Sequence, residues 1–193
     1  MGLLILIVGL AVMLGAHVFV TFRDHRAALI ARLGQGGYRI AFSVVSLIGL
    51  ILIVWGYGDY RAGEWIQIWS PPPVMRHIAV GLMLFSVILL VATYVPSHIR
   101  TRAKHPMFAA IKIWAFAHLL ANGDLGSILL FGGFLVWGVY GRIAAKRRGD
   151  AGPQTAPAGW INDVIVVVGG VVLYLALGYY FHPYFIGVPA FTG

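Results

Sequence analysis

The chain has 193 residues, of which 60% are hydrophobic and only 10% are charged, and its mean hydropathy is +0.88. Soluble domains carry about 25% charged residues, so this chain cannot cover a soluble surface. It contains no cysteine, which excludes disulfides, thiolate metal sites and cysteine nucleophiles. The formal net charge of +8 admits a nucleic-acid partner only if the basic residues form a stripe.

Six apolar segments predict an all-α polytopic membrane bundle of about six transmembrane helices, at residues 3–22, 38–57, 75–95, 107–121, 125–141 and 163–183. A span needs about 20 apolar residues, and the fourth and fifth segments are shorter. The first segment lacks a basic n-region and a cleavage site, so we expect a span and not a signal peptide. We expect one membrane domain over residues 1–193, with a flexible linker at 142–162 before the last span.

The fourth and fifth segments are joined by Asn122-Gly123-Asp124. Asn and Gly favour the C-terminus of a helix, and Asp favours the N-cap of the next one. This spacing predicts a tight helical hairpin.

The basic residues define an orientation. Alternate loops hold 11 of the 14 Lys and Arg residues, namely Arg23, Arg26, Arg32, Arg39, Arg100, Arg102, Lys104, Arg142, Lys146, Arg147 and Arg148. The positive-inside rule places the loops at 23–37, 96–106 and 142–162 in the cytoplasm and both termini outside it. The basic charge therefore indicates topology. We expect no nucleic-acid partner, because no basic stripe with interleaved aromatic residues occurs.

Two of the seven histidines, His17 and His118, lie inside predicted spans. Polar groups at membrane depth usually face a protein interior, a cavity or a cofactor. Asn122 lies four residues after His118 on the same helix face, where it would orient the imidazole. A buried histidine bonded to a neighbouring helix is the alternative. Without cysteine, a membrane cofactor site would be histidine-ligated, and imidazole is a natural axial ligand of haem.

The remaining histidines have simpler interpretations. His25 and His98 lie in basic loops, where we expect solvated side chains, and His77 and His182 lie at the outer ends of spans, where we expect structural roles. His105 precedes Pro106 and marks a helix boundary.

Lys112 shares a helix face with His105. Its amine would reach the cytoplasmic headgroups or pair with an anionic group such as a haem propionate, a role also open to Arg100, Arg102 and Lys104. No H-E-x-x-H, P-loop, G-x-S-x-G or dinucleotide motif occurs, so hydrolase and nucleotide-dependent chemistry have no support.

The chain resembles the NnrU family of bacterial membrane proteins along most of its length. The matching stretches include S-L-I-G-L-I-L-I-V-W-G-Y-G (46–58), W-S-P-P-P-V-M-R-H (69–77) and above all H-P-M-F-A-A-I-K-I-W-A-F-A-H-L-L-A-N-G-D-L (105–125). The family is associated with nitrite and nitric oxide metabolism in denitrifying bacteria. That resemblance implies an inner-membrane protein near nitrogen-oxide redox enzymes, and it does not identify a reaction.

The family is in turn similar to the 15-cis-zeta-carotene isomerase of plants and cyanobacteria, a haem b membrane enzyme. This resemblance implies haem b here, with His17 and His118 as iron ligands. Ala115 stands where the isomerase has a cysteine, so a thiolate ligand is excluded.

The sequence therefore predicts a haem b-binding membrane protein with a redox or isomerisation role linked to nitrite and nitric oxide metabolism. Its candidate cofactor residues are His17, His118, Asn122, Lys112 and His105. Two alternatives stay open. One is a non-enzymatic accessory, assembly or small-solute protein, and the other is a cis-trans isomerase of a carotenoid-like polyene.

Overall fold

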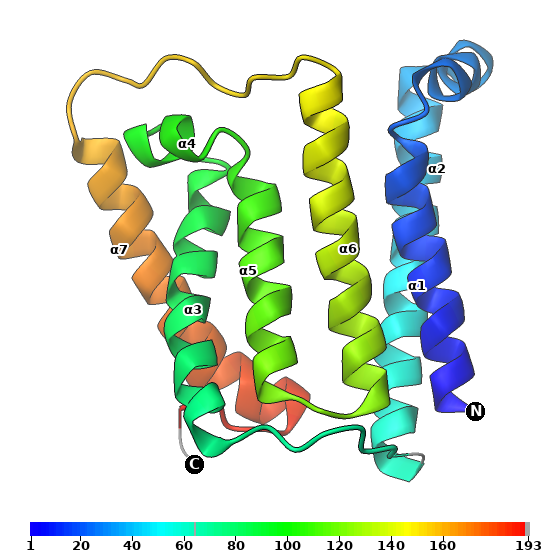
Figure 1. The fold of residues 1–193 in the computed structure, drawn as a ribbon. Coiled ribbons are helices and arrows are strands. Elements are labelled where there is room, and N and C mark those ends of the chain that lie inside the picture. Colours follow the sequence, from blue (N-terminus) through cyan, green and yellow to red (C-terminus); the bar gives the residue numbers. More distant parts are fainter. Residues whose placement is uncertain (64, 192–193) are drawn as a thin grey trace. The chain divides into compact units, whose positions relative to one another are not determined.

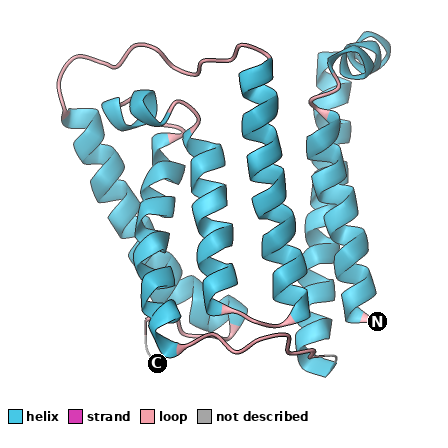
Figure 2. Ribbon diagram, in the orientation of Figure 1, coloured by secondary structure: helices cyan, strands magenta, loops and turns pink. Residues whose placement is uncertain are grey.

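The computed structural model describes residues 1–63 and 65–191, and the regular elements in that part of the chain are all helical (Figures 1 and 2). They are α1 (Gly2–Phe19), α2 (Arg23–Gly63), α3 (Pro73–Ala92), α4 (His98–Ala103), α5 (Pro106–Ala121), α6 (Leu125–Arg147), α7 (Ile161–Ala176) and the π-helix η1 (Leu177–Ile186). The predicted all-α membrane fold is confirmed.

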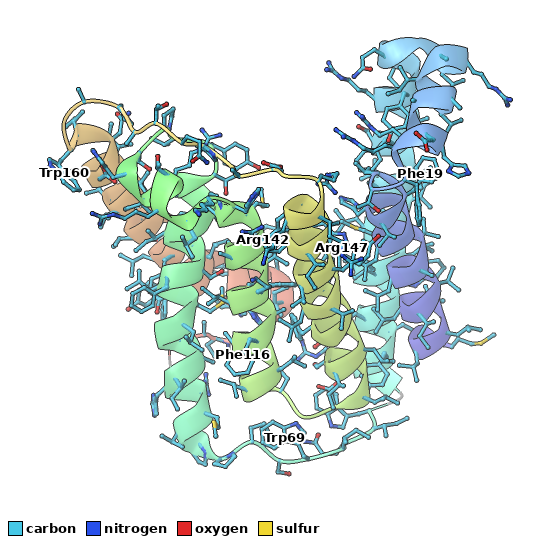
Figure 3. The ribbon with its side chains drawn as sticks, turned by 45° about the horizontal axis from the view of Figure 1, so that its top comes forward. Phe19, Trp69, Phe116, Arg142, Arg147 and Trp160 are labelled. Carbon is cyan, nitrogen blue, oxygen red and sulfur yellow. The ribbon has the colours of Figure 1, made fainter. Side chains whose placement is uncertain are left out.

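In the part of the chain described here, five helical stretches are long and apolar enough to cross a membrane: α1, α2, α3, α6 and the run Ile161–Ile186. α5 is apolar but has 16 residues, fewer than the ~20 of a full span. Large apolar side chains such as Trp69, Phe116 and Trp160 are exposed (Figure 3). An extended apolar surface of this kind is what a lipid bilayer covers.

The chain divides into two compact units. The first comprises Met1–Ser70 and Asn122–Trp137, and the second Pro71–Ala121 and Gly138–Gly193. In the first unit, α1 and α2 run antiparallel with their backbones in contact. A Cβ added at Gly9 would lie 2.7 Å from the Ile53 amide nitrogen, and one added at Gly49 2.8 Å from that of Met13. Small residues at such contacts let membrane helices approach closely.

The connection predicted as a loop at 23–37 is helical and belongs to α2. Its Ala, Leu and Arg residues are strong helix formers, and Asp24 lies in the first turn, where a carboxylate is favourable. The helix bends at Gly34, where φ is 71° and ψ is 163°, a conformation open to glycine alone. The helical part before this bend was not predicted.

The turn between α5 and α6 is bonded to the segment that follows α2 in the first unit. The amides of Ile68 and Trp69 both donate to the Gly123 carbonyl, at 2.9 and 3.0 Å, and Leu125 donates to Ile66 at 2.9 Å. The predicted cap is present, because Oδ1 of Asp124 accepts the Ser127 amide at 2.8 Å.

The second unit is built on α3, which packs against α5 and α7. The buried Ser86 hydroxyl donates to the Ala110 carbonyl of α5 at 2.8 Å. The Tyr174 hydroxyl of α7 donates to the Val80 carbonyl at 3.1 Å. Hydrogen bonds between membrane helices fix their register where apolar packing alone leaves it loose.

The short helix α4 lies between α3 and α5 in the chain and was not predicted. It is capped by Ser97, whose hydroxyl accepts the Arg100 amide at 3.1 Å. His98, which we expected to be solvated, places Nδ1 2.7 Å from Oδ2 of Asp163 and stacks on the Trp160 ring at 4.3 Å. That expectation was wrong, because α4 and the start of α7 lie together.

The last predicted span, 163–183, is helical throughout and changes type within its length. α7 continues into η1, which contains Pro183 and ends at Gly187 with φ 75°. Proline lacks the amide that an α-helix needs, and a π-turn accommodates such a gap. The widened turn carries His182.

Candidate functional site

His118 lies on α5 in the second unit and is held by its own helix. Its Nδ1 lies 2.8 Å from the Trp114 carbonyl oxygen one turn earlier, and the Trp114 ring is 5.3 Å from the imidazole. A carbonyl oxygen only accepts, so Nδ1 carries the proton and Nε2 of the neutral ring carries the lone pair. Metal-binding histidines usually have this arrangement.

His182 brings a second imidazole to His118 within the same unit. The two ring centroids are 6.1 Å apart, with an angle of 31° between the ring planes. His182 lies on the π-helix η1, and both side chains are half-buried. From the sequence, we expected a structural role for His182. The pairing of His182 with His118 depends on how η1 packs.

His17 lies on α1 in the first unit and has the same local arrangement as His118. Its Nδ1 lies 2.8 Å from the Met13 carbonyl oxygen, so Nε2 carries the lone pair of the neutral ring. The imidazole is flanked by the rings of Phe42 at 5.1 Å and Trp137 at 5.5 Å, the latter edge-on. His17 is therefore a second histidine on an apolar helix whose tautomer is fixed by its own helix.

The other predicted site residues have varied surroundings. The stem of Lys112 packs on α6, where a Cβ added at Gly138 would lie 2.9 Å from its Cγ. A buried stem leaves the amine to reach a polar region. For His118, the bond that orients the ring comes from Trp114. The orienting role of Asn122 stays a prediction.

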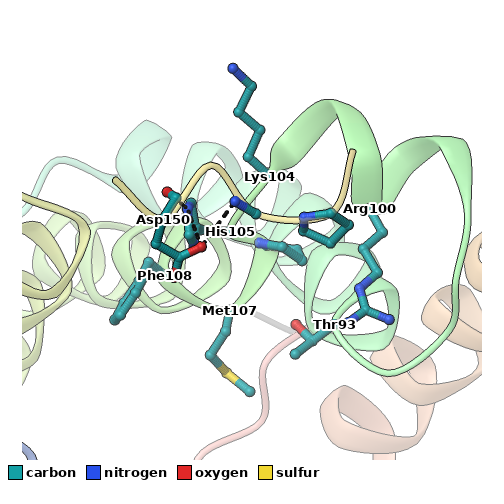
Figure 4. A pocket seen from close by; sticks show the side chains of 10 residues that line it. Thr93, Arg100, Lys104, His105, Met107, Phe108 and Asp150 are labelled. Carbon is teal, nitrogen blue, oxygen red and sulfur yellow. Dashed lines mark hydrogen bonds and ion pairs between the residues drawn. The ribbon is translucent and has the colours of Figure 1, made fainter. Parts of the chain in front are cut away.

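His105 is more than a helix boundary. Its side chain is only 10% exposed, and Nε2 donates to the Asp150 carbonyl at 3.0 Å. It helps to line a pocket of about 260 Å³ together with residues of α4 and of the segment 150–153 (Figure 4). Residues 142–162 were predicted to form a flexible linker, so the contact of Asp150 with His105 was not expected.

No group of three or more His, Asp or Glu side chains that could hold a metal ion occurs in the part of the chain described here.

Several apolar helices with histidines fixed inside them define a multi-pass membrane protein with a candidate histidine site. The sequence model of the family described as NnrU protein matches residues 5–190. The chain therefore belongs to the NnrU family, as its sequence predicted. No curated protein and no solved structure matches the chain.

Proposed function

We propose that this NnrU-family chain binds haem b in the bacterial cytoplasmic membrane, with a redox or isomerisation role linked to nitrite and nitric oxide metabolism. The observation that carries the proposal is the fixed tautomer of His118, whose Nδ1 donates to the Trp114 carbonyl at 2.8 Å. A neutral imidazole with Nε2 as its donor is the ligand that haem iron takes.

The donor set suits haem better than a bare metal ion. A bare ion needs three or more side-chain ligands, and the described residues contain no such group. A porphyrin supplies four nitrogens itself, so one or two imidazoles complete the iron. When bound, haem supplies one-electron transfer and reversible binding of small ligands such as nitric oxide.

The histidines of the chain then have distinct roles. His118 is the iron ligand proposed first, and the Trp114 carbonyl holds its ring in the ligating tautomer. Two further histidines are candidates for a second iron ligand. They are His17, predicted from the sequence, and His182, whose ring lies 6.1 Å from that of His118.

The basic residues have a role in this proposal too. Lys112, with its packed stem, would pair with a propionate and hold the porphyrin edge toward the basic side of the membrane. The positive-inside rule makes that side the cytoplasm. Nitrogen-oxide redox enzymes are the proposed partners there.

The test is an absorption spectrum of the full chain purified from haem-sufficient cells. We expect a Soret band in the wild type and in His77→Ala, a control at the end of a different helix. His118→Ala should lose most of the band while keeping its helical content. A colourless, well-folded wild type would contradict haem binding and would favour the accessory role, in which deletion lowers a partner's activity while the purified protein turns nothing over.

A further inference from the structure

The pocket beside His105 lies within the second unit, where α3 ends and α4 meets α5. Thr93, Arg100 and Lys104 contribute its polar wall, and Met107 and Phe108 its apolar one (Figure 4). Its volume is about 260 Å³, below the roughly 300–1,000 Å³ of pockets for drug-sized ligands. The space therefore suits a small group.

The chain holds this pocket in shape through a segment that its composition marks as flexible. Asp150 is fixed twice, since its carbonyl accepts from His105 at 3.0 Å and its Oδ1 accepts the Gly152 amide at 3.0 Å. Gly152 has φ +70° and lies so close to the Lys104 carbonyl that a Cβ would overlap it. The segment is therefore docked on the corner between α4 and α5.

Lys104 itself has an unusual backbone. It has φ 59°, and no other non-glycine residue in the described part of the chain has a positive φ. Such conformations cost about 1–3 kcal/mol and persist where the surrounding contacts enforce them. The surrounding contacts therefore enforce the turn between α4 and α5 that forms the pocket.

The charges of the pocket favour an anion. Arg100 is half-buried in the wall and forms no ion pair with any described residue. The lining also holds one acidic residue, Asp150, whose Oδ1 accepts the Gly152 amide and lies 3.9 Å from Nε2 of His105. In Figure 4 the Arg100 side chain extends toward Thr93, while Lys104 points away from the pocket floor.

We propose that this pocket binds a phosphate-bearing group, either the headgroup of an anionic phospholipid or a free phosphate, through the guanidinium of Arg100. A guanidinium binds phosphate oxygens in a bidentate manner. Basic residues at the ends of membrane helices attract anionic lipids, and the apolar wall of Met107 and Phe108 suits the first methylene groups of a lipid acyl chain. This proposal does not depend on haem.

The experiment is native mass spectrometry of the full chain in detergent, with phosphatidylglycerol or phosphatidylcholine added. Arg100→Ala is compared with Arg102→Ala, which removes the same charge from an exposed position of the same helix. We expect the wild type to retain phosphatidylglycerol in preference to phosphatidylcholine. Arg100→Ala should weaken this retention about tenfold or more, as loss of a charge-assisted hydrogen bond does, and Arg102→Ala should have little effect.

A second arm separates the two sources of phosphate. Calorimetric titration of inorganic phosphate into lipid-free protein should show binding that Arg100→Ala removes if the ligand is free phosphate, and no binding if the ligand is a lipid headgroup. A third variant, Gly152→Val, keeps every charge but displaces the docked segment, and it should also lose binding. Equal losses in Arg100→Ala and Arg102→Ala, retained binding in Gly152→Val, or a wild type that binds neither phosphate nor phosphatidylglycerol selectively would overturn the proposal.

Discussion

The Asp163 carboxylate contacts both the backbone amide and the ring of His98. It therefore ties the first turn of α7 to the N-terminus of α4. Its Oδ2 lies 2.7 Å from the His98 Nδ1 and accepts the His98 amide at 3.3 Å. Its Oδ1 accepts the Ile99 amide at 2.9 Å. A carboxylate at the N-terminus of a helix satisfies amides that have no partner within the helix. Asp163 therefore caps α4 from a distance of 65 residues in sequence.

Replacing Asp163 with Ala should lower the melting temperature of the purified protein by several degrees, because two part-buried amides and an imidazole lose their acceptor. Asp163→Asn should be milder, since an amide oxygen still accepts. Asp24→Ala, which removes an exposed carboxylate, is the matched control. Thermal unfolding in detergent measures the effect, and equal melting temperatures for Asp163→Ala and Asp24→Ala would contradict the capping role.

The contact between α1 and α2 gives a second prediction. Gly9→Leu should destabilise the first unit by about 1–3 kcal/mol or more, the range for overpacking, because its Cβ position lies 2.7 Å from the Ile53 amide nitrogen. Gly15→Leu on the same helix should be close to neutral, since a Cβ there meets nothing within 4 Å. Unfolding by added denaturing detergent, followed by loss of helical signal, compares the two variants. A neutral Gly9→Leu would show that the backbones do not touch.

The N-terminal cap of α6 gives a third prediction. Asp124→Ala should cost about 1 kcal/mol, because Oδ1 accepts the Ser127 amide at 2.8 Å. Asp124→Asn keeps an oxygen in the capping position and removes a carboxylate that is fully buried. We therefore expect Asn to be at least as stable as Asp in a thermal melt. If Asn proves as damaging as Ala, the charge of Asp124 has a role beyond capping.

These residues show which features could be predicted from the sequence and which could not. Apolar runs and the cap at Asp124 were predictable because span length and capping chemistry are local properties. The pairing of Asp163 with His98, and of His118 with His182, depends on which helices pack together, and no local pattern encodes that. The tautomers of His17 and His118 are fixed because each Nδ1 donates to the carbonyl four residues earlier in its helix. A predicted helix already implies that this carbonyl lies within reach.

The segment at 150–153 was missed for a different reason. Its Gly, Pro and Ala content is typical of a flexible linker. The contacts that dock it come from His105 and from the backbone of Lys104, both far away in the sequence. Composition therefore indicates how flexible the segment is in isolation, and it does not indicate which residues the segment contacts in the fold.

The last prediction concerns the second ligand of the proposed haem. Imidazole nitrogens ligate a metal at about 2.0 Å, so two histidines that share one metal must have rings that lie close together. The ring centroids of His118 and His182 are 6.1 Å apart. If haem is bound through His118, we expect His182→Ala to change its absorption and electron paramagnetic resonance spectra without removing it. His77→Ala should leave both spectra unchanged. If His182→Ala is silent and His17→Ala changes the spectra instead, the second ligand is His17. If neither variant changes the spectra, a second histidine ligand is contradicted.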